Sequence, residues 1–352
     1  MKKTIKIKLL LNKSQDNLLK AMSKEYIASV NALVQSMVDA GKSITYSSKE
    51  FTANLPSAVK AQCTLDAKSI YQKHKKGVTR TIAVLKKPVC IWNNQNYSIE
   101  DGGISFPVWV GKSRRIIVKA EITDEQKQQL QGKLGTLRIT QKSDKWIAQI
   151  AVEVDEKESR GDNVMGVDLG LKVPAVAVTG DGKVKFAGNG RQNKYTRRKN
   201  KSRRRKLGKS KKLNAIRKSK DKEQRWMQDQ DHKISRQVVN FAMQNNVSEI
   251  RMEKLANIRK TARTSRKNEK NLHTWSFYRL ARYIEYKAHM EGIRVEYVNP
   301  KYTSQKCPVC SILNKAKDRN YECACGFKHH RDLVGAKNII NAPVADGNSL
   351  SA

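Results

Sequence analysis

Hydrophobic residues along the first 80 positions follow two periods in turn. Residues 5–11 alternate apolar and polar side chains, which is the pattern of a half-buried strand. From Ser14, a natural N-terminal cap, apolar residues recur at helical spacing until Gly41, a natural C-terminal cap. A second helical pattern covers 57–75, with Pro56 at its start. The sequence therefore predicts one strand followed by two helices.

Between residues 80 and 155 the apolar spacing changes to short strand-like runs. Turn-forming residues separate these runs, as in Asp101-Gly102-Gly103. The clearest runs are 104–108, 115–118, 135–139 and 146–152. We therefore expect a small β unit that carries the two helices as an insert.

The pattern changes again beyond residue 160. A buried strand is predicted at 163–170 and a second at 173–178, followed by a Gly180-Asp181-Gly182 hairpin turn and a third strand. Helices and strands then alternate at 229–246, 249–253, 276–291 and 293–298. The order β-β-β-α-β-α-β indicates a sheet with helices packed on it. This order is shared by ribonuclease-H-like folds, although it fits other folds as well.

The charge of the chain narrows the class of its partner. The 352 residues include 71 Lys and Arg against 32 Asp and Glu, so the formal net charge is 71 − 32 = +39. An enzyme of small metabolites does not need such a charge, because self-repulsion opposes the compact state. A polyanion such as nucleic acid would neutralise it. No apolar run approaches the roughly 18 residues of a membrane span, and Lys6 and Lys8 interrupt any signal-peptide core. We expect a soluble, cytoplasmic protein that binds nucleic acid and no membrane.

The positive charge is densest between residues 191 and 222. This tract holds 17 Lys and Arg against one acid, Asp221. Such a tract is a solvated helix, a disordered arm or an element that contacts phosphates, and the net charge of the chain favours the last. Arginine grips phosphate bidentately, which positions a nucleic acid without reading its sequence. The candidate nucleic-acid-binding residues are Arg197, Arg198, Arg203, Arg204, Arg205 and Lys206.

Four of the six cysteines lie close together, at Cys307, Cys310, Cys323 and Cys325. Four thiolates suit the tetrahedral coordination of Zn²⁺ and leave no open position for water, so we expect one structural zinc ion. The first pair has the usual two-residue spacing, and the second pair is one residue shorter. In a reducing compartment such a cluster is more often a metal site than a pair of disulfides.

Three acidic residues far apart in the sequence are candidate Mg²⁺ ligands and catalytic residues. Asp168 lies on the strand predicted at 163–170, Glu253 ends the strand at 249–253, and Asp332 opens a short amphipathic helix. Each also has a structural explanation, such as a favourable charge at a helix start. If the three cluster, carboxylates of this kind bind two Mg²⁺ ions. Two such ions stabilise the attacking and leaving oxygens in phosphodiester hydrolysis.

Several segments, in this order along the chain, resemble the motifs of the TnpB family. This family comprises RNA-guided nucleases that bacterial insertion sequences encode, and it is related to the compact type V CRISPR effectors. The segments resemble the three RuvC motifs and, between the second and third, the zinc ribbon of that family. They are Gly166–Gly170, Arg251–Leu255, Tyr302–Cys310 with Cys323–Phe327, and His330–Ile339.

The resemblance implies an α+β, multidomain fold. It places a wedge-like β-barrel at 1–12 and 80–155, with a helical recognition domain inserted at 13–79. A RuvC nuclease domain of the ribonuclease-H type follows at 160–304 and 329–345, with a zinc ribbon that binds target nucleic acid inserted at 305–328. The basic stretch 254–275 corresponds to a mobile lid over the nuclease site.

The resemblance also implies an activity and its partners. A guide RNA pairs with target double-stranded DNA beside a short adjacent motif, and the protein holds the heteroduplex in a basic channel. A single RuvC site, formed by Asp168, Glu253 and Asp332, then hydrolyses both DNA strands with two Mg²⁺ ions. The implied cell compartment is the bacterial cytoplasm or nucleoid, and a monomer is favoured.

Other functions remain open at the level of sequence. A compact CRISPR-associated effector would use the same chemistry, and the protein sequence does not separate the two. A non-cleaving RNA-guided regulator would not need the three acids, and a ribosomal-type RNA-binding protein with a zinc ribbon would need neither the acids nor this length. For a recombining transposase, the sequence offers no tyrosine or serine recombinase constellation.

Overall fold

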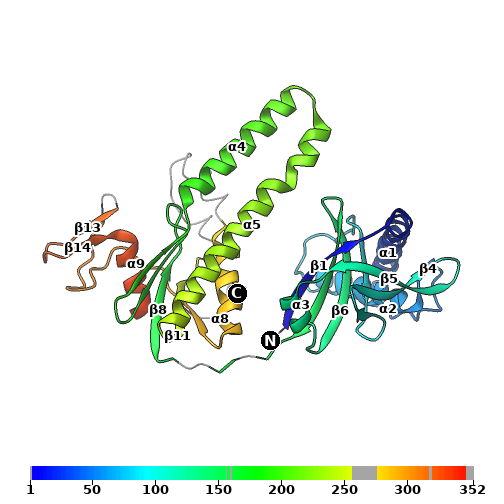
Figure 1. Cartoon of the computed structure of the whole chain (residues 1–352), viewed down its shortest axis with the longest axis horizontal. Helices are drawn as coiled ribbons and strands as arrows, with labels where there is room; N and C mark the ends of the chain where they lie inside the picture. Colours follow the sequence, from blue (N-terminus) through cyan, green and yellow to red (C-terminus); the bar gives the residue numbers. More distant parts are fainter. Residues whose placement is uncertain (1, 156, 159–160, 256–275, 317–318, 346–352) are drawn as a thin grey trace. The chain divides into compact units, whose positions relative to one another are not determined.

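The computed structural model describes residues 2–155, 157–158, 161–255, 276–316 and 319–345 (Figure 1). The chain divides into two compact units, Met1–Val154 and Asp155–Ala352, which we call the N-terminal and C-terminal units. Most of the lid predicted at 254–275 lies outside the described residues. None of the described helices combines the length and apolar character that crossing a membrane requires.

The N-terminal unit is built on a curled antiparallel sheet of seven strands. Strand β1 (Lys2–Leu10) lies between β7 (Lys145–Glu153) and β5 (Ser113–Glu121). The full order is β2-β6-β7-β1-β5-β4-β3, with the short helix α3 following β5. The remaining elements of this unit are β2 (Val89–Trp92), β3 (Ser98–Glu100), β4 (Gly103–Trp109), β6 (Leu134–Lys142) and α3 (Asp124–Gln129). The predicted strands are confirmed, while closure of the sheet into a barrel stays a prediction.

Two helices, α1 (Lys13–Asp39) and α2 (Ser57–Lys75), pack on this sheet. Helix α1 begins after Asn12 and not after Ser14, because Asn12 and Gln15 form a capping box in which each side chain accepts the backbone N–H of the other. Gly41 follows the last turn with a φ of +63°, as its predicted role requires. The helices share one hydrophobic core with the sheet, so their division into a separate recognition domain stays a prediction.

The C-terminal unit contains a five-stranded mixed sheet in the order β10-β9-β8-β11-β12. Strands β8, β11 and β12 run parallel, and β9 and β10 are antiparallel to their neighbours. The strand positions agree with those predicted from the apolar pattern. Their bounds are β8 (Asn163–Asp168), β9 (Ala175–Thr179), β10 (Val184–Ala187), β11 (Val247–Glu253) and β12 (Arg294–Val298).

Helices cover both faces of this sheet (Figure 1). On one face, α5 (Leu213–Gln244) and α8 (Phe277–Met290) bury Val238, Leu280 and Ile284 against β8 and β11. On the other face, α9 (Arg331–Asn341) packs Leu333 and Ala336 against β9. A two-stranded hairpin, β13 (Asn320–Glu322) with β14 (Lys328–His330), leads directly into α9.

The basic tract is helical, which the apolar pattern did not predict. Helix α4 (Gly190–Lys209) and the first half of α5 form a long antiparallel hairpin (Figure 1). The predicted helix at 229–246 therefore starts 16 residues too late, since α5 begins at Leu213 (229 − 213 = 16). The early part of α5 has few apolar residues to give a period. Lysine and arginine are nevertheless good helix formers, so the helix continues through them.

Helix α9 lies unusually close to β8, because a glycine faces it. A Cβ atom added at Gly166 would lie 2.0 Å from the backbone oxygen of Ala336. No side chain fits in that space, so only glycine lets the helix backbone rest on the strand. This contact fixes the height of α9 over the sheet.

The substitution Gly166→Ala tests this contact. We expect it to lower the free energy of unfolding by about 2 kcal/mol or more, because the helix must move away from the strand. Gly208→Ala in α4 is the matched control, since its added Cβ would have no neighbour nearer than 3.8 Å and alanine favours a helix. Urea denaturation followed by circular dichroism compares the variants. Equal midpoints for Gly166→Ala and the parent would contradict the packing described here.

Candidate functional site

Two of the three candidate acids are placed side by side by strand pairing. Asp168 is the last residue of β8, and Glu253 is the last residue of β11. The strands are parallel, and Met252 pairs with Val167. The next residue on each strand therefore emerges at the same edge of the sheet. Burial of the strands ends here, which leaves both carboxyl groups half-buried.

The third acid, Asp332, comes from α9 and is brought to the same edge by close helix packing. Gly335 lies one turn further along α9, and a Cβ added there would lie 3.1 Å from Asp168 Oδ2. The two glycines, Gly166 and Gly335, thus set α9 against β8. Asp332 is 8% exposed and is close enough to Asp168 for their charges to interact. The structure therefore brings the three predicted acids together.

The surroundings of Asp168 and Glu253 disfavour the negatively charged forms of these two acids. Desolvation raises the pKa of Asp168 well above its ordinary value, and the charges of Glu253 and Asp332 raise it further. The guanidinium groups of Arg319 and Arg331 act in the opposite direction without cancelling the rise. Desolvation also raises the pKa of Glu253. Carboxylate oxygens are hard ligands, and a divalent cation such as Mg²⁺ would relieve the repulsion between them. The three acids therefore fit such an ion.

Two further side chains contact the acids and were not found from the sequence. Arg319, which precedes β13, donates N–H groups to both carboxylate oxygens of Asp332. Thr303, which follows β12, donates its hydroxyl to Glu253. A single arginine among 71 basic residues has no sequence signature. Thr303 lies within the segment that resembles the zinc ribbon, but nothing in that pattern connects it to Glu253.

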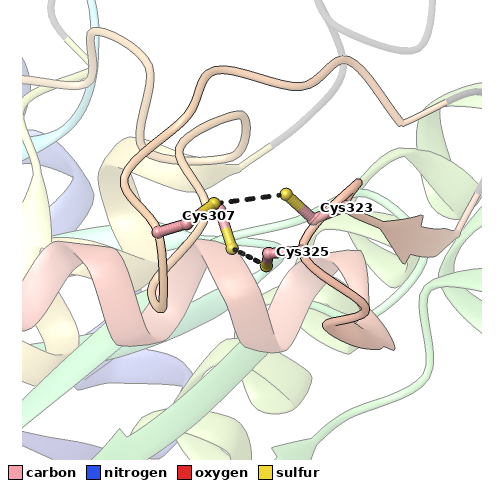
Figure 2. A group of neighbouring side chains, drawn as sticks. Cys307, Cys323 and Cys325 are labelled. Atoms are coloured by element: carbon pink, nitrogen blue, oxygen red, sulfur yellow. Dashed lines mark hydrogen bonds between the residues drawn. The ribbon is translucent and has the colours of Figure 1, made fainter.

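The four cysteines form a compact group. Their four Sγ atoms lie within 4.8 Å of one another, and among the described residues this is the one group of three or more potential ligands close enough to hold a metal ion. Figure 2 shows the labelled thiols of Cys307, Cys323 and Cys325 turned toward a common centre. The sulfur atoms of Cys310 and Cys323 lie 3.4 Å apart. Four thiols at this spacing fit a tetrahedral metal ion such as Zn²⁺.

The short second pair is accommodated by a turn. Gly326 has a φ of +87°, and its N–H donates to the carbonyl of Cys323. At the first pair, burial raises the pKa of the Cys307 thiol, but hydrogen bonds from the backbone of Cys310 and Val309 lower it to about 7 overall. A thiol with a lowered pKa is more readily available as a thiolate ligand.

His330, near the cysteine group, caps a helix. His330 is the N-terminal cap of α9, and its Nδ1 accepts the backbone N–H of Asp332 at 3.3 Å. His330 also contacts the ring of Phe186 edge-on. His329 is exposed. The cap orients the first turn of α9, and the sequence pattern does not reveal it.

The candidate phosphate-binding residues on α4 face in two directions. Arg204 pairs with Glu223 of α5 at 2.6 Å. Arg197 is half-buried, and desolvation lowers its pKa although the nearby Glu223 and Asp231 oppose this. These two arginines therefore hold the helical hairpin together. The side chains that are exposed along α4 are Arg198, Arg203, Arg205 and Lys206.

Two family models match the chain, and both fall on the segments described above. Residues 148–259 match the model described as "Probable transposase". Residues 277–339 match the model described as "Cas12f1-like, TNB domain". The first match includes Asp168 and Glu253, and the second includes the four cysteines and Asp332.

Curated relatives agree with these matches. A TnpB-like protein of Methanocaldococcus jannaschii is 39% identical over 122 residues, which cover 34% of this chain and 44% of that protein. The matching segments are therefore similar to those of the TnpB family. The CRISPR-associated endodeoxyribonuclease Cas12f1 of Sulfoacidibacillus thermotolerans is 28% identical over 218 residues, or 56% of this chain and 50% of that protein. The chain thus spans about half the length of the curated relatives it matches.

A solved structure has a similar fold over most of the chain. It is the cryo-EM structure of a Cas12f1–sgRNA–target DNA complex, with a TM-score of 0.71 and 15% sequence identity. The match covers 96% of this chain and 84% of that chain. The expected mixture of helices and sheets is therefore confirmed at the level of the fold, and its division into the predicted domains stays a prediction.

The raised pKa of Asp168 predicts a pH-dependent stability. Because the folded-state pKa of Asp168 lies above its ordinary value, the charged carboxylate destabilises the fold at neutral pH. We therefore expect Asp168→Asn to melt at a higher temperature than the parent near pH 7 in EDTA. The difference should disappear as the pH falls through the folded-state pKa, where the parent is also neutral. Differential scanning calorimetry across a pH series measures it.

Magnesium and a control acid complete this test. Mg²⁺ should raise the melting temperature of the parent and leave that of Asp168→Asn unchanged, because a ligand stabilises the state that binds it. Asp181→Asn is the control. Hydrogen bonds, chiefly with Thr179 and then with Asn163, lower the pKa of Asp181 to about 2, so its removal should not stabilise the fold. A lower melting temperature for Asp168→Asn than for the parent in EDTA would contradict the repulsion argued here.

Proposed function

We propose that the chain is an RNA-guided DNA endonuclease of the TnpB family. In this proposal, a guide RNA pairs with target DNA next to a short adjacent motif, and one RuvC site hydrolyses phosphodiester bonds of both strands. The observation that carries the proposal is the convergence of Asp168, Glu253 and Asp332 at one edge of the sheet. Acids from three distant segments have no structural reason to share a desolvated edge, since their mutual repulsion costs stability.

The strand order supports assigning this unit to the ribonuclease-H type. Numbered along the chain within the C-terminal unit, its sheet has the order 3-2-1-4-5, with three antiparallel strands followed by two parallel ones. Asp168 ends the first strand and Glu253 the fourth. We assign the RuvC domain to 160–304 and 329–345 and the zinc ribbon to 305–328, and the cysteine group supports the latter.

Asp168, Glu253 and Asp332 would hold two Mg²⁺ ions, and the four cysteines would hold one structural Zn²⁺ ion. When bound, Mg²⁺ supplies Lewis-acid stabilisation of the oxygen that attacks phosphorus and of the oxygen that leaves. The chain's own residues prepare the site. Thr303 orients Glu253 through its hydroxyl. Arg319 holds Asp332 and lowers the charge that the metal-free acids experience.

Charge and relatives support the proposed partners, a guide RNA and target double-stranded DNA. The net charge of +39 calls for a large polyanion. The exposed residues of α4 offer guanidinium groups spaced along one helix, as phosphate recognition requires. A relative over 218 residues is named an endodeoxyribonuclease associated with CRISPR. The solved structure of similar fold is titled a complex with sgRNA and target DNA.

A compact CRISPR-associated effector is the second candidate. The matches to Cas12f1 proteins favour it, and its chemistry would be the same. The origin of the guide separates the two candidates, because one guide comes from a transposon end and the other from a repeat array. A non-cleaving guided regulator is disfavoured by the three acids, since it has no use for a repulsive cluster.

Sequencing of co-purified RNA and a cleavage assay test the proposed function together. We expect a discrete RNA with a variable end segment to co-purify from cells that carry the native locus. With that RNA and Mg²⁺, the protein should cut DNA that matches the variable segment. Asp168→Ala should retain the RNA and lose cleavage. Cleavage retained by Asp168→Ala would refute the site, and the absence of any specific RNA would refute the guided mechanism.

Some arginines of α4 are exposed and others contact α5, so their substitutions should have different effects. Arg205→Ala should weaken RNA binding and lower the slope of log affinity against log salt by about 1, because it removes one phosphate contact. Arg204→Ala should leave that slope unchanged and lower the melting temperature, because Glu223 loses its partner. Filter binding at several salt concentrations measures the slopes. An unchanged slope for Arg205→Ala would argue against α4 as a phosphate-contacting helix.

A further inference from the structure

The segment between β12 and the cysteine group contacts both metal-binding candidates. We call residues 302–306 the strap. Within it, Thr303 is 5% exposed, and its hydroxyl lies within hydrogen-bond distance of Glu253 and of the Pro300 carbonyl. A hydroxyl has one hydrogen to donate, and the charged carboxylate is the stronger acceptor. Thr303 therefore fixes one oxygen of Glu253.

The strap is held from α9 by one side chain. The Asn338 amide nitrogen donates to the carbonyls of Thr303 and Lys306, each at 2.7 Å. Both hydrogens of this amide are thus used on the strap. Because α9 also carries Asp332, the position of Thr303 is tied to the helix that supplies the third acid.

The strap is held from the cysteine group by a second side chain. Tyr321 on β13 is fully buried and packs with Cys307 and Cys323. Its hydroxyl donates to the carbonyl of Gln305 at 2.9 Å. The strap continues directly into Cys307. Only a short segment, held by Asn338 and Tyr321, therefore separates the cysteine thiols from the Thr303 hydroxyl.

The backbone of the strap begins in a strained conformation. Tyr302 has a φ of +64°, which is rare for a bulky residue. Its carbonyl accepts the N–H groups of Gln305 and Lys306 at 2.9 and 3.0 Å. Strain of this kind persists where neighbouring contacts determine the conformation, and it is concentrated at functional sites. The turn directs Thr303 inward, while Tyr302 remains exposed.

We propose that Thr303 is a positioning residue that presents Glu253 for divalent-cation binding, and that the strap makes this position depend on the cysteine group. The proposal rests on the proposed function, since it assumes that the three acids bind a divalent cation. It adds that the site is not preformed by the sheet alone. The cysteine group, through Tyr321 and the strap, contributes to the affinity of the acids for metal.

Direct binding of Mn²⁺ to the full-length, RNA-stripped protein tests the role of Thr303. Electron paramagnetic resonance measures free Mn²⁺, so the readout does not depend on a guide or on cleavage. Thr303→Val removes the hydroxyl and keeps the shape of the side chain. We expect it to weaken Mn²⁺ binding about 10-fold, as the loss of a hydrogen bond to a metal ligand does. Thr303→Ser, which restores the hydroxyl, should bind like the parent.

The controls separate failure of this inference from failure of the proposed function. Thr179→Val makes the same change at a buried threonine of β9, which pairs with Met165 near the start of β8, away from the acids. It should bind Mn²⁺ like the parent. Asp168→Ala should abolish the specific binding. If Asp168→Ala has no effect, both proposals fail. If Asp168→Ala abolishes binding and Thr303→Val matches Thr179→Val, only the role of Thr303 is refuted.

Tyr321→Phe tests the dependence on the cysteine group. The phenyl ring keeps the packing beside the thiols and loses the hydrogen bond to the strap. We expect weaker Mn²⁺ binding with unchanged zinc content, and an effect that does not add to that of Thr303→Val, because the two changes act on one structural unit. Unchanged Mn²⁺ binding in Tyr321→Phe would overturn the coupling, and so would fully additive effects of the two substitutions.

Discussion

The close packing of α9 on β8 is the contact on which the candidate site depends. Strand pairing alone places Asp168 beside Glu253, because the two end neighbouring parallel strands. The third acid needs a helix that crosses the same edge with no side chain between the two backbones. Gly166 and Gly335 provide that space. Any larger residue would move Asp332 away and leave two acids without the third.

This packing has an electrostatic cost that the surrounding residues partly offset. Three carboxyl groups share a desolvated edge, and the pKa of Asp168 rises as a result. Arg319 pairs with Asp332, and Thr303 donates to Glu253. These partners stabilise the metal-free acids without filling the edge with apolar side chains. Repulsion between the carboxylates lowers the stability of the fold, and a bound divalent cation would restore it. Functional sites commonly lower the stability of a protein in this way.

The sequence predicted the elements whose apolar residues recur at a regular spacing, and the functional residues that belong to a recognisable motif. The strands that carry Asp168 and Glu253 are apolar runs, and the cysteines have a recognisable spacing. It did not predict elements without an apolar repeat or functional residues outside a motif. The first half of α5 is helical through lysine and arginine, without an apolar stripe. Arg319 and Thr303 act through contacts across the fold, and only the tertiary structure brings them to Asp332 and Glu253.

The order of these segments along the chain explains how the three acids and the cysteine group come to be in contact. The chain leaves the sheet at β12, beside β11 and Glu253, and returns at α9 with Asp332. The cysteine group lies within this crossing. Thr303, before the first cysteine pair, donates to Glu253, and Arg319, between the two pairs, donates to Asp332. Strand pairing and the packing of α9 place the acids, and these two contacts tie the cysteine group to the second acid and the third.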